Sequence, residues 1–298
     1  MPLTPEHREL YEIIHRFLWK ELRRLPKLVA CEDFNDRIQW LKLFDQRHET
    51  ITCTDKIRLR DYVNARLGTG YCPQIYQIAE RFDDIAFESL PERYVIKTSH
   101  DWGRAIVVNS RMPLDKEAAR QNLTAALQRE FGRERGEWAY RFIKPRILVE
   151  EFIDCGTGRP PPDFKFICVD GSIKFVHFLS DRDNGLKEQV IDIDGHDMGT
   201  PFLSYIPYGS DFTVPPNWYE MKSCAEKLSK GWKLVRVDLY YAHGKVYVGE
   251  MTFFPGGGAY PGAGQRELGQ LLDFDRSTVM PIISHSLDAE TSARGLKD

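Results

Sequence analysis

Long apolar runs, closely spaced cysteines and an excess of either charge are all missing from this chain of 298 residues. No apolar stretch approaches the roughly 20 residues that a helix needs to cross a bilayer, and the N-terminus lacks the basic-then-apolar pattern of a signal peptide. The 41 basic and 44 acidic side chains are mixed along the sequence, so no basic stripe indicates nucleic acid. These absences favour a cytoplasmic globular protein whose partners must be inferred from its sites.

The six cysteines lie far apart, and none belongs to a CxxC pair. This spacing argues against a zinc module and gives no compact disulfide framework, so reduced structural thiols are expected. The sequence also has no internal repeat or low-complexity tract. At this length the chain can bury a large core, either as one large domain or as two to three lobes.

Helical periodicity dominates the first 70 residues. Thr4 and Pro5 are typical of an N-cap and a first helical position, and apolar residues then recur at helical spacing to about residue 24. The same spacing predicts helices over 34–44 and 54–67. No strand pattern is present in this part of the chain.

The pattern then changes to a mixture of strands and helices. β-rich runs over 94–97, 104–109 and 147–153 predict three strands, and a polar helical pattern fills 114–131. A glycine- and proline-rich connector over 156–162 is the best candidate for a boundary between lobes.

Two hairpins are predicted in the second half of the chain. Asp170-Gly171 suits the positive φ angles of a tight turn, and His243-Gly244 joins a second pair of strands. The mixture of strands and helices gives the fold class α+β. The expected elements are strands over 164–169 and 173–178, an irregular segment over 180–216, a helix over 218–230, and strands over 234–241 and 245–253.

The second hairpin carries a pattern that predicts a metal site. Alternation along its first strand puts Arg236, Asp238 and Tyr240 on one face, and the same period puts Glu250 and Thr252 on one face of its partner. If the strands pair, Asp238, Glu250 and Thr252 converge as hard oxygen ligands, which suit Mg²⁺, with Arg236 beside them. The residues alone leave an alternative open, a solvated face whose ion pairs contribute little.

These segments carry a family resemblance. The run over 236–255 and the glycine-rich loop over 256–264 resemble the metal-binding strands and following loop of ATP-grasp enzymes such as D-alanine–D-alanine ligases. More closely, the chain resembles the TupA-like ATP-grasp family, linked to teichuronopeptide and capsular polysaccharide synthesis, from about residue 34 to residue 272. The other motifs that carry the resemblance lie at 54–58, 94–97, 147–153 and 163–166.

The resemblance implies an ATP-grasp fold, in which two α+β lobes clasp ATP and Mg²⁺. A helical N-terminal region over 1–50 would precede a smaller lobe over 51–155, with the phosphate loop and the hinge. A larger lobe over 156–298 would hold the metal site.

The resemblance also assigns cations to the phosphates. Lys97, at a strand end, and Lys56, near a helix start, would lie at the α- and β-phosphates, and Lys165 would reach the γ-phosphate. An ammonium on a flexible stem can follow phosphate charge as it shifts. The segment 99–103 occupies the place of the phosphate-covering loop, where His100 would contact a phosphate or merely cap the turn.

The hinge of the resembling enzymes corresponds to Glu150, Glu151, Phe152 and Ile153. There a carboxylate and backbone groups would read the adenine amine, while apolar side chains sandwich the ring, a mixture that ligand slots need. Asp163 would meet the ribose hydroxyls.

The implied reaction is that of an ATP-dependent, ADP-forming carboxylate–amine ligase. ATP phosphorylates a carboxylate and an amine attacks the acyl phosphate, while Mg²⁺, Arg236 and Lys165 offset charge on the phosphoryl oxygens. The glycine-rich loop would hold the acyl phosphate. The family setting implies a small-molecule or glycan-linked carboxylate, including a glycan-lipid precursor at the membrane surface, joined to an amino acid or other amine.

Three alternatives stay open at this point. A carbohydrate kinase would stop at phosphoryl transfer. A metal-dependent glycosyltransferase would use the DxD-like run Asp181-Arg182-Asp183. A nucleotide- or glycan-binding protein would show no turnover.

Overall fold

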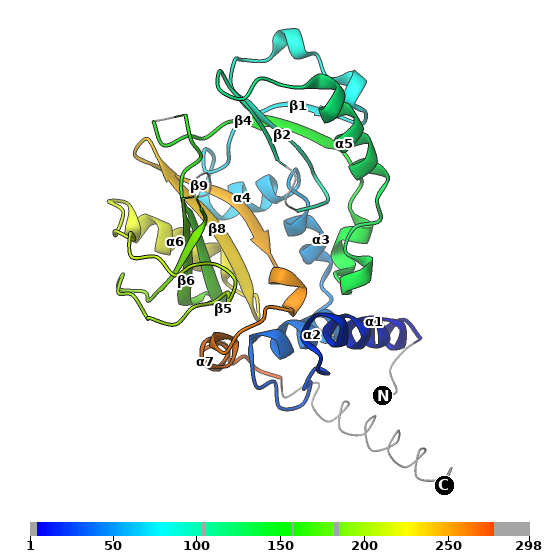
Figure 1. The fold of residues 1–298 in the computed structure, drawn as a ribbon, viewed down its shortest axis with the longest axis vertical. Helices are drawn as coiled ribbons and strands as arrows, with labels where there is room; N and C mark the ends of the chain where they lie inside the picture. Colours follow the sequence, from blue (N-terminus) through cyan, green and yellow to red (C-terminus); the bar gives the residue numbers. More distant parts are fainter. Residues whose placement is uncertain (1–4, 103–104, 157, 182–184, 277–298) are drawn as a thin grey trace.

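Two antiparallel sheets and a group of helices form the molecule (Figure 1). The computed structural model describes residues 5–102, 105–156, 158–181 and 185–276. The expected N-cap Thr4 therefore lies outside the described residues, as do Gly103, Arg104 and the Arg182-Asp183 part of the DxD-like run. In Figure 1 the smaller sheet lies at the top, the larger sheet at the lower left, and α3 and α4 between them.

The N-terminal helices largely follow the periodicity of the sequence. They are α1 (Pro5–Leu22), α2 (Phe34–Phe44), α3 (His48–Thr54) and α4 (Leu59–Leu67). The predicted single helix over 54–67 is wrong, because α3 ends at Thr54 and α4 starts only at Leu59. In the turn between them the Asp55 carboxylate accepts a hydrogen bond from the Ile57 backbone N–H at 2.8 Å, a local bond that competes with helix formation. Lys56 therefore lies in a turn.

The smaller sheet packs one face against a helix. Its strands are β1 (Ile75–Ala79), β2 (Tyr94–Thr98), β3 (Ile106–Val108) and β4 (Ile147–Glu151), in the order β1-β4-β2-β3, and α5 (Lys116–Gln128) covers one side. Ile96 and Val149 lie opposite each other and share a buried core with Leu123 of α5. Alternation then turns Val95, Lys97 and Glu150 to the other face.

The larger sheet holds the two predicted hairpins. Its strands are β5 (Asp163–Val169), β6 (Ser172–Ser180), β7 (Lys187–Ile191), β8 (Val235–Ala242) and β9 (Lys245–Thr252), in the order β7-β6-β5-β8-β9. Asp170 and Gly171 have φ angles of 45° and 79°, which confirms the predicted tight turn. Trp218 of α6 (Trp218–Ser229) packs on Phe166 with ring centroids 5.5 Å apart, so α6 covers one face of the sheet.

Two strands were not predicted. β1 has no period-two pattern, and its Ile78 is 45% exposed. β7 lies inside the segment expected to be irregular, and its residues Lys-Glu-Gln-Val-Ile are polar for a buried strand. Glu188 is nevertheless fully buried, because it pairs with His177 at 2.8 Å and accepts hydrogen bonds from the Leu203 backbone N–H.

The glycine-rich segment is held firmly by α2. The short 3₁₀ helix η5 (Pro255–Gly258) is followed by α7 (Gly264–Gln270), and Gln39 donates hydrogen bonds to the carbonyls of Gly257 and Gly258 at 2.9 and 2.8 Å. A Cβ on Gly258 would lie 2.7 Å from the Cβ of Ile38, and its φ is 65°, so glycine is needed at this close approach. The remaining 3₁₀ helices are η1 (Phe82–Asp84), η2 (Phe87–Ser89), η3 (Arg133–Arg135) and η4 (Trp138–Phe142).

Within the described ranges, no helix combines the length and the apolar character that crossing a membrane requires.

Candidate active site

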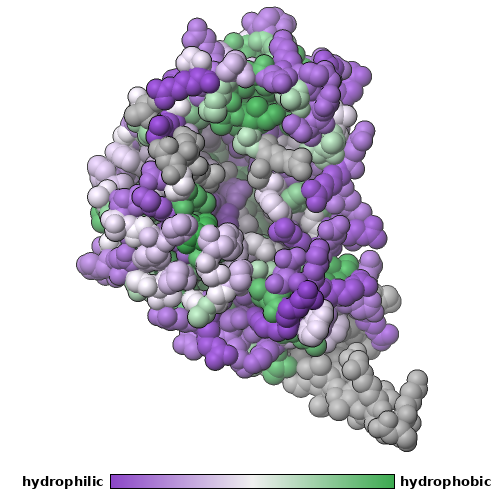
Figure 2. Space-filling view, viewed as in Figure 1, coloured by the Kyte–Doolittle hydropathy of each residue, from purple (hydrophilic) through white to green (hydrophobic). Residues whose placement is uncertain are grey.

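A cavity of about 260 Å³ lies between the two sheets. The face shown in Figure 2 is visibly hollowed there. The smaller sheet contributes Val95 and Lys97, and the larger sheet contributes Asp163, Tyr240 and Val248. This first cavity also contains most of the residues that the sequence assigned to the nucleotide, namely Lys56, Lys97, Glu150, Glu151, Phe152, Ile153 and Asp163.

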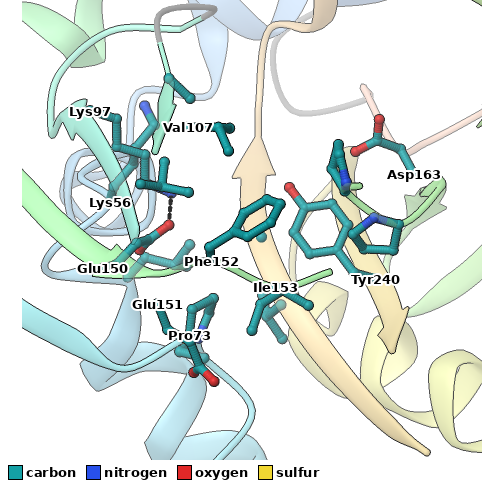
Figure 3. Close-up of a pocket in the computed structure, with 18 of the residues that line it drawn as sticks. Lys56, Pro73, Lys97, Val107, Glu150, Glu151, Phe152, Ile153, Asp163 and Tyr240 are labelled. Atoms are coloured by element: carbon teal, nitrogen blue, oxygen red, sulfur yellow. Dashed lines mark ion pairs between the residues drawn. The ribbon is translucent and has the colours of Figure 1, made fainter. Parts of the chain in front are cut away.

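One part of the first cavity is an apolar slot. Phe152 follows the end of β4 and, in Figure 3, lies between Lys97 and Glu150 at one side and Tyr240 at the other. Pro73, Val95 and Val248 complete the apolar walls. A flat, apolar cleft with a few polar groups is the usual form of a site for a heterocyclic ring.

The other part of the first cavity gathers cations around one carboxylate. Glu150 is buried and forms an ion pair with Lys97 (Figure 3). It forms a second ion pair, at 3.2 Å, with Arg60 of α4. Lys56 donates a hydrogen bond to the backbone carbonyl of Asp101, and burial lowers the pKa of its ammonium. Three cationic side chains therefore line one end of the cavity, as binding of polyanionic phosphates requires.

Arg60 was not predicted as a site residue from the sequence, although it lies only four residues after Lys56. A carboxylate of the Glu150-Glu151 pair was expected to read an adenine amine, and the structure shows that the Glu150 carboxylate holds two cations. The Glu151 carboxylate accepts a hydrogen bond from the Gln74 backbone N–H at 3.1 Å. Both carboxylates thus have partners within the protein that the sequence did not reveal.

His100 lies away from this cavity. Its ring is 2% exposed, and Nε2 is 3.2 Å from the carbonyl of Ala126 in α5. Burial lowers the pKa of the imidazole, which favours the neutral form. The prediction that His100 contacts a phosphate is therefore not supported, and the ring fits a packing role beneath α5.

The β8–β9 hairpin brings the predicted metal ligands together. Asp238 lies opposite Glu250 and Arg236 lies opposite Thr252, all on one face of the sheet. Arg236 Nη2 donates to Asp238 Oδ2 at 2.8 Å and to Glu250 Oε1 at 2.7 Å, and Thr252 Oγ1 donates to the same Glu250 oxygen at 2.8 Å. Two carboxylates that reach one nitrogen can also reach one shared cation, so this oxygen set fits Mg²⁺.

Lys165 joins this cluster from the neighbouring strand β5. It lies opposite Asp238, and its ammonium is 2.6 Å from Asp238 Oδ2 and 4.0 Å from Asp163 Oδ1. Burial alone would raise the pKa of Glu250, but attraction by Arg236, Lys56 and Lys165 brings it down to about 2. The carboxylate therefore stays ionised at neutral pH, as a metal ligand must.

The cluster is not a solvated surface. Asp238 is 2% exposed and Arg236 is 9% exposed. Burying several charges together costs desolvation energy, and such clusters concentrate at functional sites. The alternative of weak surface ion pairs on this hairpin is therefore wrong.

A second cavity, of about 560 Å³, begins at the same hairpin. Tyr240 and Gly249 line the first cavity, whereas Arg236, Glu250 and Thr252 line the second. The β8–β9 hairpin therefore contributes to both cavities, and Glu250 of the second cavity directly follows Gly249 of the first.

Residues 36–273 match the protein family described as TupA-like ATPgrasp. The chain belongs to this ATP-grasp family. The match covers both sheets and both cavities except for the part contributed by α1, and it confirms the expected fold of two α+β lobes. No curated protein matches the chain.

Solved structures with a similar arrangement include an ATP complex of D-alanine–D-alanine ligase from Bacillus anthracis, at 17% identity and a TM-score of 0.44, covering 81% of this chain and 68% of that one. An L-amino acid ligase from Bacillus licheniformis has 15% identity and a TM-score of 0.48, with coverages of 92% and 64%. The ATP-grasp ligase PsnB, in a complex with Mg and ADP, has 14% identity and a TM-score of 0.40, with coverages of 75% and 58%. The chain thus spans about two thirds or less of their lengths, and the family assignment rests on the family match.

Asp181 is the one residue of the DxD-like run that the structure describes, and it does not belong to the site. Asp181 is exposed and forms an ion pair with Lys187 at 3.2 Å, and it lines neither cavity. This placement gives the glycosyltransferase alternative no support.

Proposed function

We propose that this TupA-like ATP-grasp protein is an ATP-dependent, ADP-forming carboxylate–amine ligase. The observation that carries the proposal is the charged cluster of Asp238, Glu250, Arg236 and Lys165 on the larger sheet. Arg236 and Glu250 of this cluster line the second cavity, and Gly249, next to Glu250, lines the first. The first cavity has the apolar slot and the cations that a nucleotide needs, and the second has space for a substrate beside the same cluster.

The nucleotide would lie along the first cavity. Its adenine would enter the slot at Phe152 and Ile153, Asp163 would meet the ribose, and the phosphates would lie at Lys56 and Lys97. Arg60 adds a cation to this set, and Glu150 orients Arg60 and Lys97 through its two ion pairs. ATP would thus be aligned with its γ-phosphate directed towards the β8–β9 hairpin.

Asp238, Glu250 and Thr252 would hold Mg²⁺, which when bound supplies charge neutralisation at the phosphoryl oxygens. Lys165 and Arg236 add fixed positive charge at the same place, where charge builds up during transfer. A substrate carboxylate oxygen attacks the γ-phosphorus as the bond to ADP breaks. An amine nitrogen then attacks the acyl carbon, phosphate leaves, and the nitrogen loses a proton as the amide forms.

The family's link to surface polysaccharide synthesis supports a finer proposal for the substrates. The carboxylate would belong to a bacterial surface glycan or its precursor, either as a small molecule or on a glycan-lipid at the membrane surface. The amine would be an amino acid or a related compound, and the reaction would take place in the cytoplasm.

The proposal is tested by release of ADP and phosphate from Mg-ATP with a panel of carboxylates and amines. Asp238→Asn and Glu250→Gln are expected to lower the rate by at least about 100-fold, equivalent to about 3 kcal/mol of lost charge stabilisation. Glu226→Gln, an exposed change on α6, serves as the matched control and should retain the wild-type rate. ADP release that needs no amine and leaves a stable phosphorylated product would instead identify a kinase.

A further inference from the structure

The second cavity is walled by aromatic rings and by the N-terminal helix. Phe17 of α1, Trp102 and Tyr260 line it, together with Arg135 of η3. α1 precedes the segment that matches the family. Its packing on η3 depends on Gly136, where a Cβ would lie 2.9 Å from the side chains of Leu10 and Ile14.

Arg135 is held at this wall in a way that leaves its guanidinium edge available. The group lies 4.4 Å from the ring centre of Trp102 and 5.8 Å from that of Phe17. Its backbone carbonyl accepts a hydrogen bond from Lys42 at 2.6 Å, which fixes the position of η3. A guanidinium stacked on aromatic faces keeps its N–H donors in its own plane, free to bind an anion in two places at once.

The other charged side chains of the cavity are offset by neighbouring charges or are exposed to solvent. Arg236 is paired with Asp238 and Glu250, whereas Arg135 forms no ion pair with the residues that the structure describes. Glu137 is buried, and attraction by Lys42 and Arg135 partly offsets the desolvation that raises the pKa of its carboxyl group. Glu21 is exposed. Arg135 is therefore the cation at this wall that is best placed to meet a charged group from outside.

Glu137 adds a second polar feature to the wall. It is 2% exposed, and one of its carboxylate oxygens has no hydrogen-bond partner among the described residues. An unpaired polar atom beside a cavity is stabilised when a ligand supplies the missing partner. The wall therefore combines a cation, a hydrogen-bond acceptor and flat apolar faces, which together suit a polar ring-bearing acid.

We infer that the second cavity binds the carboxylate substrate and that Arg135 holds its carboxylate group. The substrate class is a carboxylate carried on a ring, either a sugar or an aromatic body, that stacks on the rings around Arg135. This inference rests on the proposed function for its meaning, because it places the group to be phosphorylated beside Arg236 and Glu250. Arg135 is a substrate-binding residue that neutralises the carboxylate as it enters.

The experiment is a calorimetric titration with Mg²⁺ and a non-hydrolysable ATP analogue present. Its probes are D-glucuronate with D-glucuronamide and phenylacetate with phenylacetamide, two pairs in which a neutral amide of similar shape replaces the carboxylate. At least one carboxylate should bind the wild type more tightly than its amide. Arg135→Gln should weaken that carboxylate by about 10- to 100-fold, the usual range for a charged hydrogen bond, and leave the amide unchanged.

Two further variants separate recognition from folding. Arg135→Lys keeps the charge but not the planar fork, so its loss of affinity should be smaller than that of Arg135→Gln. Arg133→Gln lies in the same turn, where Arg133 is exposed and pairs with Glu130 at 2.9 Å, and it should bind both members of each pair like the wild type. Unchanged affinity for the ATP analogue in every variant shows that the fold is intact.

The inference is overturned if neither carboxylate binds the wild type more tightly than its amide does. It is also overturned if Arg135→Gln binds the carboxylate and the amide with the same affinities as the wild type. Because the titration requires no turnover, it can succeed even if no amine supports ADP release. A different result would remove this inference alone and leave the proposed function standing. In that case Asp238→Asn loses ligase activity, whereas Arg135→Gln keeps the wild-type KM for the carboxylate.

Discussion

Replacing Asp238 by asparagine tests whether the buried charges depend on one another. Its carboxylate accepts hydrogen bonds from Lys165 at 2.6 Å and from two nitrogens of Arg236 at 2.6 and 2.8 Å. Asparagine keeps one acceptor oxygen but removes the negative charge. Lys165 would then keep only Asp163, at 4.0 Å, and Arg236 would keep only Glu250, at 2.7 Å, as an ionic partner. Removing one partner of a buried ion pair typically costs 3–5 kcal/mol, and with the retained acceptor we expect a loss of about 3 kcal/mol in the free energy of unfolding.

For a chain of this size that loss corresponds to a decrease in Tm of about 5 °C. The assay is urea unfolding without nucleotide, followed by circular dichroism. Glu250→Gln should cost less, because 31% of the Glu250 side chain is exposed and Arg236 keeps its bonds to Asp238. Glu226→Gln should change the free energy by less than about 0.5 kcal/mol. An Asp238→Asn protein as stable as the wild type would refute the claim that these charges are mutually dependent.

Three further predictions concern the nucleotide cavity and the helix beneath the glycine-rich segment. Lys97→Met should raise the KM for ATP and destabilise the protein, because Glu150 loses one of its two cations; steady-state kinetics and thermal unfolding check both effects. Phe152→Ala should weaken ATP binding by roughly 10-fold through loss of apolar contact, measured by titration with a non-hydrolysable analogue, and equal affinity would remove Phe152 from the adenine slot. Burial lowers the pKa of Lys42 from 10.5 to about 7, so the unfolded chain binds more protons between these values and the free energy of unfolding should rise with pH across them. In Lys42→Met this contribution should vanish, as the difference between the two urea-unfolding profiles at pH 7 and pH 9 will show.

The sequence predicted those elements whose residues repeat with a regular period. α2 agrees with the predicted range, and both hairpins follow from dipeptides that suit tight turns. β7 was missed because Glu188 becomes buried only through His177 and the Leu203 backbone, which are distant partners that no local pattern reveals. The break after α3 was not predicted for a different reason, because it depends on a local contact. The Asp55 carboxylate accepts a hydrogen bond from the Ile57 backbone N–H, which interrupts the helix even though the apolar residues continue at helical spacing.

Three residues assigned to the site lie on short strand motifs, of which Lys97 and Asp163 were assigned by the family resemblance and Asp238 from the alternation along its strand. Lys97, Asp163 and Asp238 each occupy a strand, where a period of two fixes the direction of the side chain. His100 lies just beyond a strand, in a segment without such a period. Its ring contacts the carbonyl of Ala126 in α5 and does not line the cavity. The ion pair between Arg60 and Glu150 could not be predicted, because ion pairing between separate elements leaves no local pattern in a sequence.

The second cavity could not have been predicted, and its construction explains why. Its wall joins α1, η3 and the glycine-rich segment, and Lys42 of α2 fixes two of these by donating to the carbonyls of Arg135 and Gly257 at 2.6 and 2.7 Å. Residue 42 reads in the sequence as a polar position of an amphipathic helix, yet it is fully buried. A single buried amino group therefore positions both η3, which carries the guanidinium that we assign to the substrate, and the glycine-rich backbone. If the proposed function holds, we expect that changes in α1 and η3 alter which acid is bound, while the β8–β9 hairpin keeps the proposed phosphoryl chemistry.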